Sequence, residues 1–168
     1  MSSEIDAVAA RARAVRLAVF DVDGVMTDGT LYIGPQGEAL KAFNILDGHG
    51  VKMLQSAGVA TAIISGRSSE AVTKRAGELG IRHVVQGAED KVREFEKVRA
   101  SLGLEASACA FVGDDLPDLP VMRLCGLAVA VANAVEPVKS AAHYVTRAHG
   151  GRGAVREFCE LVLRAQGR

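Results

Sequence analysis

The chain has 168 residues, enough for one domain with a full hydrophobic core, and its 20 acidic and 20 basic residues leave no net charge. This balance, with only 4% aromatic residues and no Trp, argues against a nucleic-acid partner. No run approaches the roughly 18 apolar residues of a membrane span, so we expect no membrane association. Three cysteines in apolar surroundings favour a reducing compartment, and no secretory signal is visible, so we expect a cytoplasmic protein.

Helices and strands are predicted to alternate along the chain. The strands are expected over 16–21, 59–64, 81–86, 108–112, 127–131 and 143–145. The helices are expected over 2–14, 47–57, 68–79, 90–102, 116–125, 136–141 and 154–165. Such alternation predicts an α/β fold, a doubly wound and mostly parallel sheet with helices on both faces.

One segment departs from this alternation. Two extended runs, 30–33 and 38–43, flank the turn Gly34-Pro35-Gln36-Gly37, a pattern typical of a β-hairpin. The hairpin follows the first strand almost at once. We therefore expect a flap over about 29–44 that overhangs the end of that strand.

The first strand ends abruptly at two acids. Asp21 and Asp23 follow an apolar run, and Gly24 breaks the strand. The carboxyl ends of strands in open α/β sheets face the ligand crevice. Because two carboxylates this close repel each other and are costly to bury, a shared cation is the simplest remedy. The sequence therefore predicts a divalent metal site here.

Three further polar signals lie at or near the ends of later strands. Ser65 ends one strand, Lys91 begins the helix after another, and Gly113-Asp114-Asp115 with Asp118 follows a third. These residue types fit phosphoryl transfer through an aspartyl-phosphate, with a carboxylate nucleophile and a second acid that protonates the leaving alcohol. A hydroxyl and an ammonium can hold the phosphoryl oxygens, and oxygen ligands favour Mg²⁺.

These motifs resemble the haloacid dehalogenase superfamily of phosphatases. Residues 21–28 match its first motif, Ser65 its second, Lys91 its third and residues 113–118 its fourth. Within the superfamily the chain is similar over about 15–168 to the 3-deoxy-D-manno-octulosonate 8-phosphate phosphatases. Three more segments carry that likeness, 43–50, 64–67 and 150–157.

The resemblance implies a role for each motif residue. Asp21 would be the nucleophile and Asp23 the general acid/base. Mg²⁺ would be held by Asp21, by Asp114 and by the backbone carbonyl of Asp23. Ser65 and Lys91 would bind the phosphoryl group. Of Asp115 and Asp118, one would orient Lys91 or a metal-bound water and the other would cap the next helix.

The resemblance also implies substrate contacts and an assembly. Asp47 and Gly48 would line the crevice, and Arg67 and Arg152 would bind anionic parts of a sugar acid phosphate. A structural ion pair is the alternative for Arg67. Family members form homotetramers without a large cap domain, and the hairpin and C-terminal tail of neighbours help close each site. We therefore expect one domain over 1–168 with a tail at about 149–168.

The expected function is Mg²⁺-dependent hydrolysis of 3-deoxy-D-manno-octulosonate 8-phosphate to the free sugar acid and phosphate, for lipopolysaccharide biosynthesis. Two alternatives stay open: a phosphatase of a sialic-acid-type 9-phosphate, and a non-catalytic oligomerisation module. A phospho-accepting signalling domain is less favoured, because such a domain does not need an acid at the position of Asp23.

Overall fold

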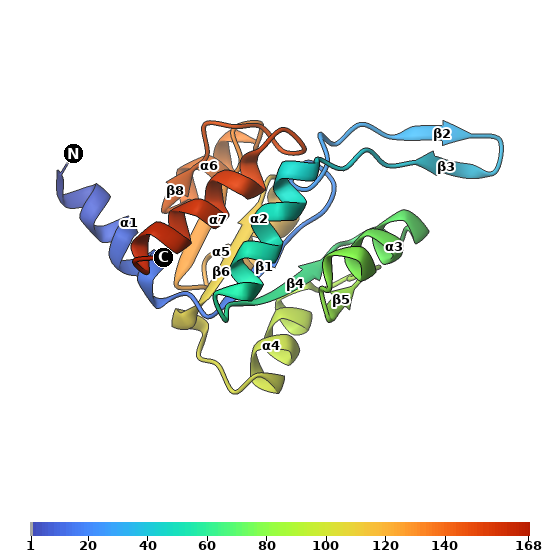
Figure 1. Cartoon of the computed structure of the whole chain (residues 1–168). Helices are drawn as coiled ribbons and strands as arrows, with labels where there is room; N and C mark the ends of the chain where they lie inside the picture. The colour runs from blue at the N-terminus through green and yellow to red at the C-terminus, as the bar shows by residue number, and fades with distance from the viewer. Residues whose placement is uncertain (1) are drawn as a thin grey trace.

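The computed structural model describes residues 2–168, and side chains from residue 5 onward. In this part of the chain a six-stranded parallel sheet runs in the order β5-β4-β1-β6-β7-β8 (Figure 1). Its strands are β1 (Leu17–Phe20), β4 (Ala60–Ile64), β5 (His83–Val85), β6 (Cys109–Gly113), β7 (Leu127–Ala130) and β8 (Tyr144–Val145). The predicted mostly parallel sheet is confirmed.

Helices connect and cover these strands. They are α1 (Ser2–Ala14), α2 (Ile45–Ser56), α3 (Glu70–Leu79), α4 (Lys91–Ser101), α5 (Leu119–Met122), α6 (Glu136–Ala141) and α7 (Ala154–Ala165). On one side of the sheet α7 packs between α1 and α2, and α4 packs against α5 on the other (Figure 1). In the described residues no helix is long and apolar enough to cross a membrane.

The strand order reverses beside β1, and this reversal places the site. From β1 the chain adds β4 and β5 on one side, and α4 then leads back to β6 on the other side. Phe20, at the end of β1, is in register with Ile63 of β4 and Val112 of β6. The carboxyl ends of these three strands therefore meet at the switch point, where doubly wound sheets bind their ligands.

The central strands consist of apolar residues because helices cover both of their faces. Every residue of β1, β6 and β7 is buried. Phe20 meets Phe158 of α7 edge to face, with ring centroids 5.8 Å apart. This packing fixes the end of β1, from which the two acids extend.

The predicted hairpin is also present. It comprises β2 (Tyr32–Gly34) and β3 (Gly37–Leu40), and it projects away from the sheet (Figure 1). The helix expected over 116–125 is instead a 3₁₀ turn, Leu116–Asp118, followed by the short α5. Pro120 explains the break, because it lacks the N–H that would bond to the carbonyl of Leu116 in a continuous helix.

Candidate active site

The loop after β1 brings Asp21 to the switch point. Its backbone N–H donates to the carbonyl of Val112 at 3.1 Å, which ties the loop to β6. The side chain is buried. Gly24 turns the chain with φ at +88°, and a Cβ atom there would lie 2.0 Å from Oδ2 of Asp114. Only glycine lets Asp114 approach the loop this closely.

Three carboxylates crowd together at this point. Ligand oxygens of Asp21, Asp114 and Asp118 all lie within 4.8 Å of one another. Burial, followed by the charge of Asp118, raises the pKa of Asp21 to about 6. Burial and then the charges of Asp21 and Asp118 raise the pKa of Asp114 to about 8. Burial, and after it the neighbouring negative charges, thus disfavours the ionised form of these acids.

The carboxylate of Asp114 has an unused oxygen. Its Oδ1 atom is buried and has no hydrogen-bond partner among the described residues. A buried acceptor without a partner is costly, and a divalent cation would satisfy it while relieving the repulsion between the acids. The donor set, made of oxygens alone, fits Mg²⁺.

Lys91 is held over Asp21 by a second acid. Its Nζ atom lies 3.0 Å from Oδ1 of Asp21 and 2.7 Å from Oδ1 of Asp118. The other oxygen of Asp118 accepts the backbone N–H of Asp114 at 2.9 Å. Asp115 instead accepts the N–H of Leu116 and caps the 3₁₀ turn. Of the two roles left open by the sequence, Asp118 therefore orients Lys91 and Asp115 is the cap.

Ser65 completes the floor of the pocket. It follows β4, its side chain is buried, and its Oγ accepts the backbone N–H of Arg67 at 3.4 Å. The residues lining the pocket are Asp21, Asp23, Ser65, Gly66, Arg67, Lys91, Asp114, Asp115, Pro117 and Asp118. The fold thus brings together the four sequence motifs and Arg67.

Asp23 turns away from the other acids toward the hairpin. Its Oδ1 atom lies 2.5 Å from Nζ of Lys41, just after β3, and Lys41 also pairs with Glu38 at 2.9 Å. Burial alone would lower the pKa of Lys41, but hydrogen bonds to the two acids outweigh burial and raise it. Lys41 and Glu38 were not predicted as site residues from the sequence. The one feature that could have indicated them is their opposite charge at a spacing of three residues.

Asp47 and Gly48 contact neighbouring helices and do not line the pocket. The carboxylate of Asp47 accepts the backbone N–H groups of Gly153 at 3.3 Å and Arg156 at 2.8 Å, so it caps α7 from α2. A Cβ on Gly48 would lie 2.3 Å from the guanidinium of Arg75 on α3. Neither residue is among those that line the pocket of this single chain, and both lie where α2 packs against other helices.

The segment before α7 supports the loop after β1. Asn133 donates to the carbonyl of Gly24 at 3.0 Å and accepts the N–H of Gly150 at 2.6 Å. A Cβ on Gly150 would lie 1.7 Å from the Gly24 oxygen. Arg152 is exposed, pairs with Asp28 at 3.3 Å and does not line the pocket of its own chain. Asn133 carries no sequence signal, since its partners are remote in the chain.

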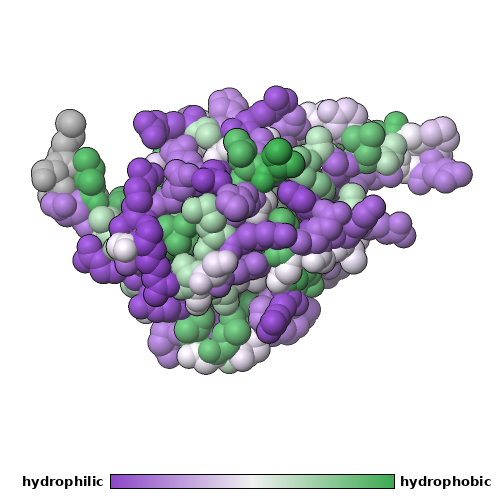
Figure 2. Space-filling model, in the orientation of Figure 1, coloured by the Kyte–Doolittle hydropathy of each residue, from purple (hydrophilic) through white to green (hydrophobic). Residues whose placement is uncertain are grey.

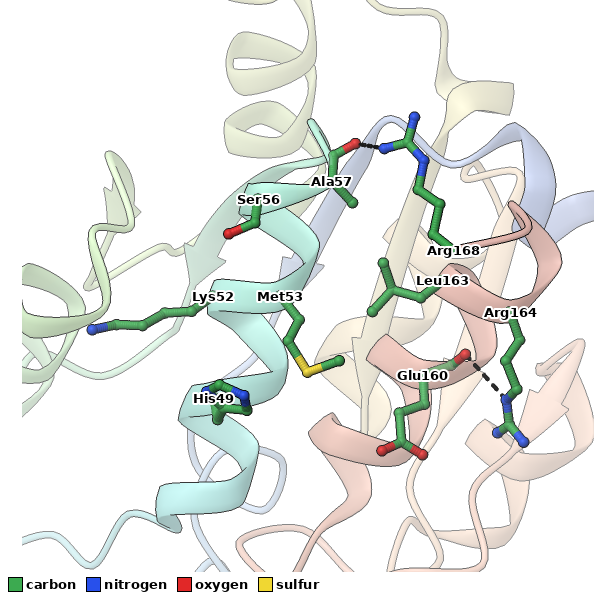
Figure 3. Close-up of a pocket in the computed structure, with 9 residues that line it drawn as sticks. All are labelled: His49, Lys52, Met53, Ser56, Ala57, Glu160, Leu163, Arg164 and Arg168. Atoms are coloured by element: carbon green, nitrogen blue, oxygen red, sulfur yellow. Dashed lines mark hydrogen bonds between the residues drawn. The ribbon is translucent and has the colours of Figure 1, made fainter.

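A larger groove lies elsewhere, between α2 and α7, with a volume of about 730 Å³. Met53 and Leu163 lie between the two helices, and Lys52 and Arg164 point away on opposite sides (Figure 3). None of the predicted site residues lines this groove. The smaller, polar pocket at the strand ends is therefore the candidate active site.

Comparisons with known proteins show which family the chain belongs to. The family described as haloacid dehalogenase-like hydrolase matches residues 83–158. The 3-deoxy-D-manno-octulosonate 8-phosphate phosphatase of Yersinia pestis is 50% identical over 96% of this chain and 86% of its own length. The chain belongs to this phosphatase family. It is therefore an enzyme of the haloacid dehalogenase superfamily, as the motifs indicated.

Solved structures of the family share the fold. The Yersinia pestis enzyme has a TM-score of 0.95 at 49% identity, with 96% of this chain and 88% of that chain covered. The Moraxella catarrhalis member was solved with magnesium, phosphate and 3-deoxy-D-manno-octulosonate, and it has a TM-score of 0.93 at 43% identity. That match covers 95% of this chain and 92% of the other.

Proposed function

We propose that this chain hydrolyses 3-deoxy-D-manno-octulosonate 8-phosphate to the free sugar acid and phosphate, with Mg²⁺ as cofactor. One observation carries the proposal. The buried carboxylate of Asp21 faces the Lys91 ammonium at 3.0 Å, beside an unpartnered oxygen of Asp114. A nucleophile, a phosphate-binding cation and a metal ligand thus share one pocket, and relatives at up to 50% identity carry this activity in their names.

The first half of the reaction transfers the phosphoryl group. A carboxylate oxygen of Asp21 attacks phosphorus, the bond from phosphorus to the sugar oxygen breaks, and Asp23 gives its proton to that oxygen. Lys91 and Ser65 bind the phosphoryl oxygens. Asp21, Asp114 and the backbone carbonyl of Asp23 would hold Mg²⁺, which would supply positive charge that offsets the charge of the phosphoryl group.

The second half releases phosphate. Asp23, now a carboxylate, takes a proton from water as that water attacks the phosphorus atom, and the bond to Asp21 breaks. The two acids can divide this work because their surroundings differ. Asp21 is buried against Lys91, whereas the side chain of Asp23 is 21% exposed and pairs with Lys41 beside the hairpin.

Recognition of a sugar acid needs a cation outside the phosphate pocket. Arg67 lines the pocket, and its side chain is 47% exposed. Its planar guanidinium suits the substrate carboxylate. The free sugar acid would serve lipopolysaccharide biosynthesis. Asp47 and Gly48 are assigned instead to the packing of α2, and Arg152 would need to act on a neighbouring subunit.

We further propose a homotetramer in the cytoplasm. The hairpin and the start of α2 expose large apolar side chains, and Figure 2 shows hydrophobic surface there. These residues are Leu31, Tyr32, Ile33, Leu40, Ile45 and Leu46. Exposed apolar patches favour subunit contacts. The three cysteines are free and buried, as expected in a reducing compartment.

Phosphate release from a panel of sugar phosphates tests the function. The panel holds 3-deoxy-D-manno-octulosonate 8-phosphate, a sialic-acid-type 9-phosphate and hexose phosphates without a carboxylate. We expect the eight-carbon substrate to have the highest kcat/KM, with loss of activity in EDTA and in Asp21→Asn. A preference for the nine-carbon ester would favour that alternative. No release from any ester would favour the non-catalytic module.

A further inference from the structure

Asp23 belongs to a closed ring of four charged side chains. Lys41 lies 2.5 Å from Oδ1 of Asp23 and 2.9 Å from Oε2 of Glu38. Arg67 closes the ring, because its Nε lies 3.5 Å from Oδ2 of Asp23 and its Nη2 lies 3.4 Å from Oε2 of Glu38. Acids and bases alternate, so each oxygen of Asp23 faces a different cation.

The two cations are not equivalent. The side chain of Lys41 is 2% exposed, whereas that of Arg67 is 47% exposed. A short, desolvated ion pair is costly to break by removing one partner, whereas a long and exposed contact contributes little. Lys41 is therefore the fixed partner of Asp23, and Arg67 is free to turn toward a ligand.

Glu38 anchors Lys41 to the body of the protein. Its Oε1 atom accepts the hydroxyl of Ser69 at 2.5 Å, and Ser69 lies just before α3. The ring therefore connects β3 and the residue after it to the loops that follow β1 and β4. As a consequence, the orientation of the Asp23 side chain depends on how the hairpin is seated.

We infer that Lys41 is a positioning residue, which holds Oδ1 of Asp23 so that Oδ2 faces the leaving group. The inference rests on the proposed function only through the role of Asp23 as general acid. Arg67 leaves Oδ2 when substrate enters. With Arg67 turned away, Oδ2 takes up a proton from solvent water. That proton passes to the leaving oxygen while the bond from that oxygen to phosphorus breaks, and Asp23 becomes a carboxylate again.

A series of aryl phosphates isolates this effect. In 4-nitrophenyl, phenyl and benzyl phosphate the leaving group becomes steadily more basic and so needs a proton more, while its shape changes little. The ratio kcat/KM reports the steps up to transfer onto Asp21, so activation of water does not enter. In Lys41→Met we expect kcat/KM to fall by about 10²-fold for benzyl phosphate, the lower range of general-acid effects, and hardly at all for 4-nitrophenyl phosphate.

Matched variants separate positioning from folding. Lys139→Met removes a more exposed lysine that is likewise paired with an acid three residues earlier, Glu136 at 3.2 Å, and it should leave the series unchanged. Lys41→Arg should restore part of the loss. Glu38→Gln keeps Lys41 but removes one of its two charged partners. We expect kcat/KM in this variant to depend more steeply on leaving-group basicity than in the wild type, but less steeply than in Lys41→Met. This variant keeps the inference testable if Lys41→Met folds poorly.

The aryl phosphate series also distinguishes failure of the proposed substrate from failure of the proposed positioning role of Lys41. Wild-type activity on aryl phosphates without activity on the eight-carbon sugar acid phosphate would overturn the substrate proposal and leave this inference testable. Equal losses for every member of the series in Lys41→Met would overturn the inference, because a loosened pocket affects all leaving groups alike. So would an unchanged kcat/KM throughout.

Discussion

The Nζ atom of Lys91 lies 2.7 Å from Oδ1 of Asp118 in a buried ion pair. The same carboxylate accepts the backbone N–H of Asp114 with its other oxygen. One side chain thus orders both the phosphate-binding lysine and the loop of the proposed metal ligand. Gly113 permits the contact, since a Cβ there would lie 2.7 Å from the Asp118 side chain.

Replacement of Asp118 should therefore damage catalysis more than folding. Asp118→Asn keeps only one acceptor oxygen, so its amide N–H₂ must face a donor, either Lys91 or the backbone N–H groups of Asp114 and Asp115, and one of these two contacts is lost. We expect kcat/KM to fall by about 10- to 100-fold, as for other residues that orient metal ligands. Asp115→Asn is the matched control, because Asp115 caps an exposed turn. Similar losses in both variants would contradict the division of roles.

Metal binding should depend on pH. Because the pKa values of Asp21 and Asp114 rise from 3.8 to about 6 and about 8, the metal-free native state holds more protons than the unfolded chain in that range. Stability from these groups therefore falls as pH rises from about 4 to 8. Mg²⁺ competes with those protons, so it should raise Tm more at pH 8 than at pH 5.

Calorimetric melting with Mg²⁺ or EDTA at the two pH values measures this difference. At 100 times its Kd, a ligand adds about 2.7 kcal/mol to the free energy of unfolding. Asp114→Asn should abolish most of the increment. An increment that is equal at both pH values, or that survives in this variant, would show that Mg²⁺ binds elsewhere.

Gly24 and Gly58 allow the effect of a positive φ to be separated from the effect of a collision with Asp114. Gly24 and Gly58 have φ at +88° and +84°, but only a Cβ on Gly24 would collide, with Asp114. Gly58→Ala should lose about 1–2 kcal/mol of stability, the usual cost of a left-handed residue. Gly24→Ala should lose more, because Asp114 must also move. Gly24→Ala should also raise the Mg²⁺ concentration needed for half-maximal activity, and Gly58→Ala should not. Equal Mg²⁺ requirements would contradict the contact.

Asp47 should matter for stability and not for substrate affinity. Its carboxylate caps α7 through two backbone N–H groups. In Asp47→Ala these donors lose their partner, and we expect the free energy of unfolding to fall by about 1–3 kcal/mol in urea titrations. The KM for the sugar acid phosphate should stay near the wild-type value. A raised KM at unchanged stability would restore the crevice role that the motif suggested.

The sequence predicts the sheet well because its central strands are buried on both faces. Mostly apolar runs such as Ala60–Ile64 and Cys109–Gly113 have few alternatives to a central strand, and a polar residue, Ser65 or Asp114, follows each run. The four motifs follow these ends, so their convergence could be foreseen. The predicted helix that Pro120 divides was wrong because one missing N–H outweighed its apolar pattern.

Contacts between remote segments could not be foreseen in the same way. Asp47 meets α7 across more than 100 residues of chain, and Asn133 meets Gly24 at a similar separation. No local pattern records such a partner. Lys41 reaches Asp23 only because the hairpin folds back on the loop that precedes it. The contacts that position the loops and side chains of the site are therefore seen only in the structure.

Chemical trapping of the intermediate tests the central claim most directly. The enzyme is mixed with 3-deoxy-D-manno-octulosonate 8-phosphate and Mg²⁺, quenched in acid within one turnover, and digested for peptide mass mapping. The account predicts a phosphoryl group on Asp21 that is absent when EDTA is present or when Asp21 is replaced by Asn. Full turnover with no phosphorylated peptide, or with the phosphoryl group on another residue, would contradict it.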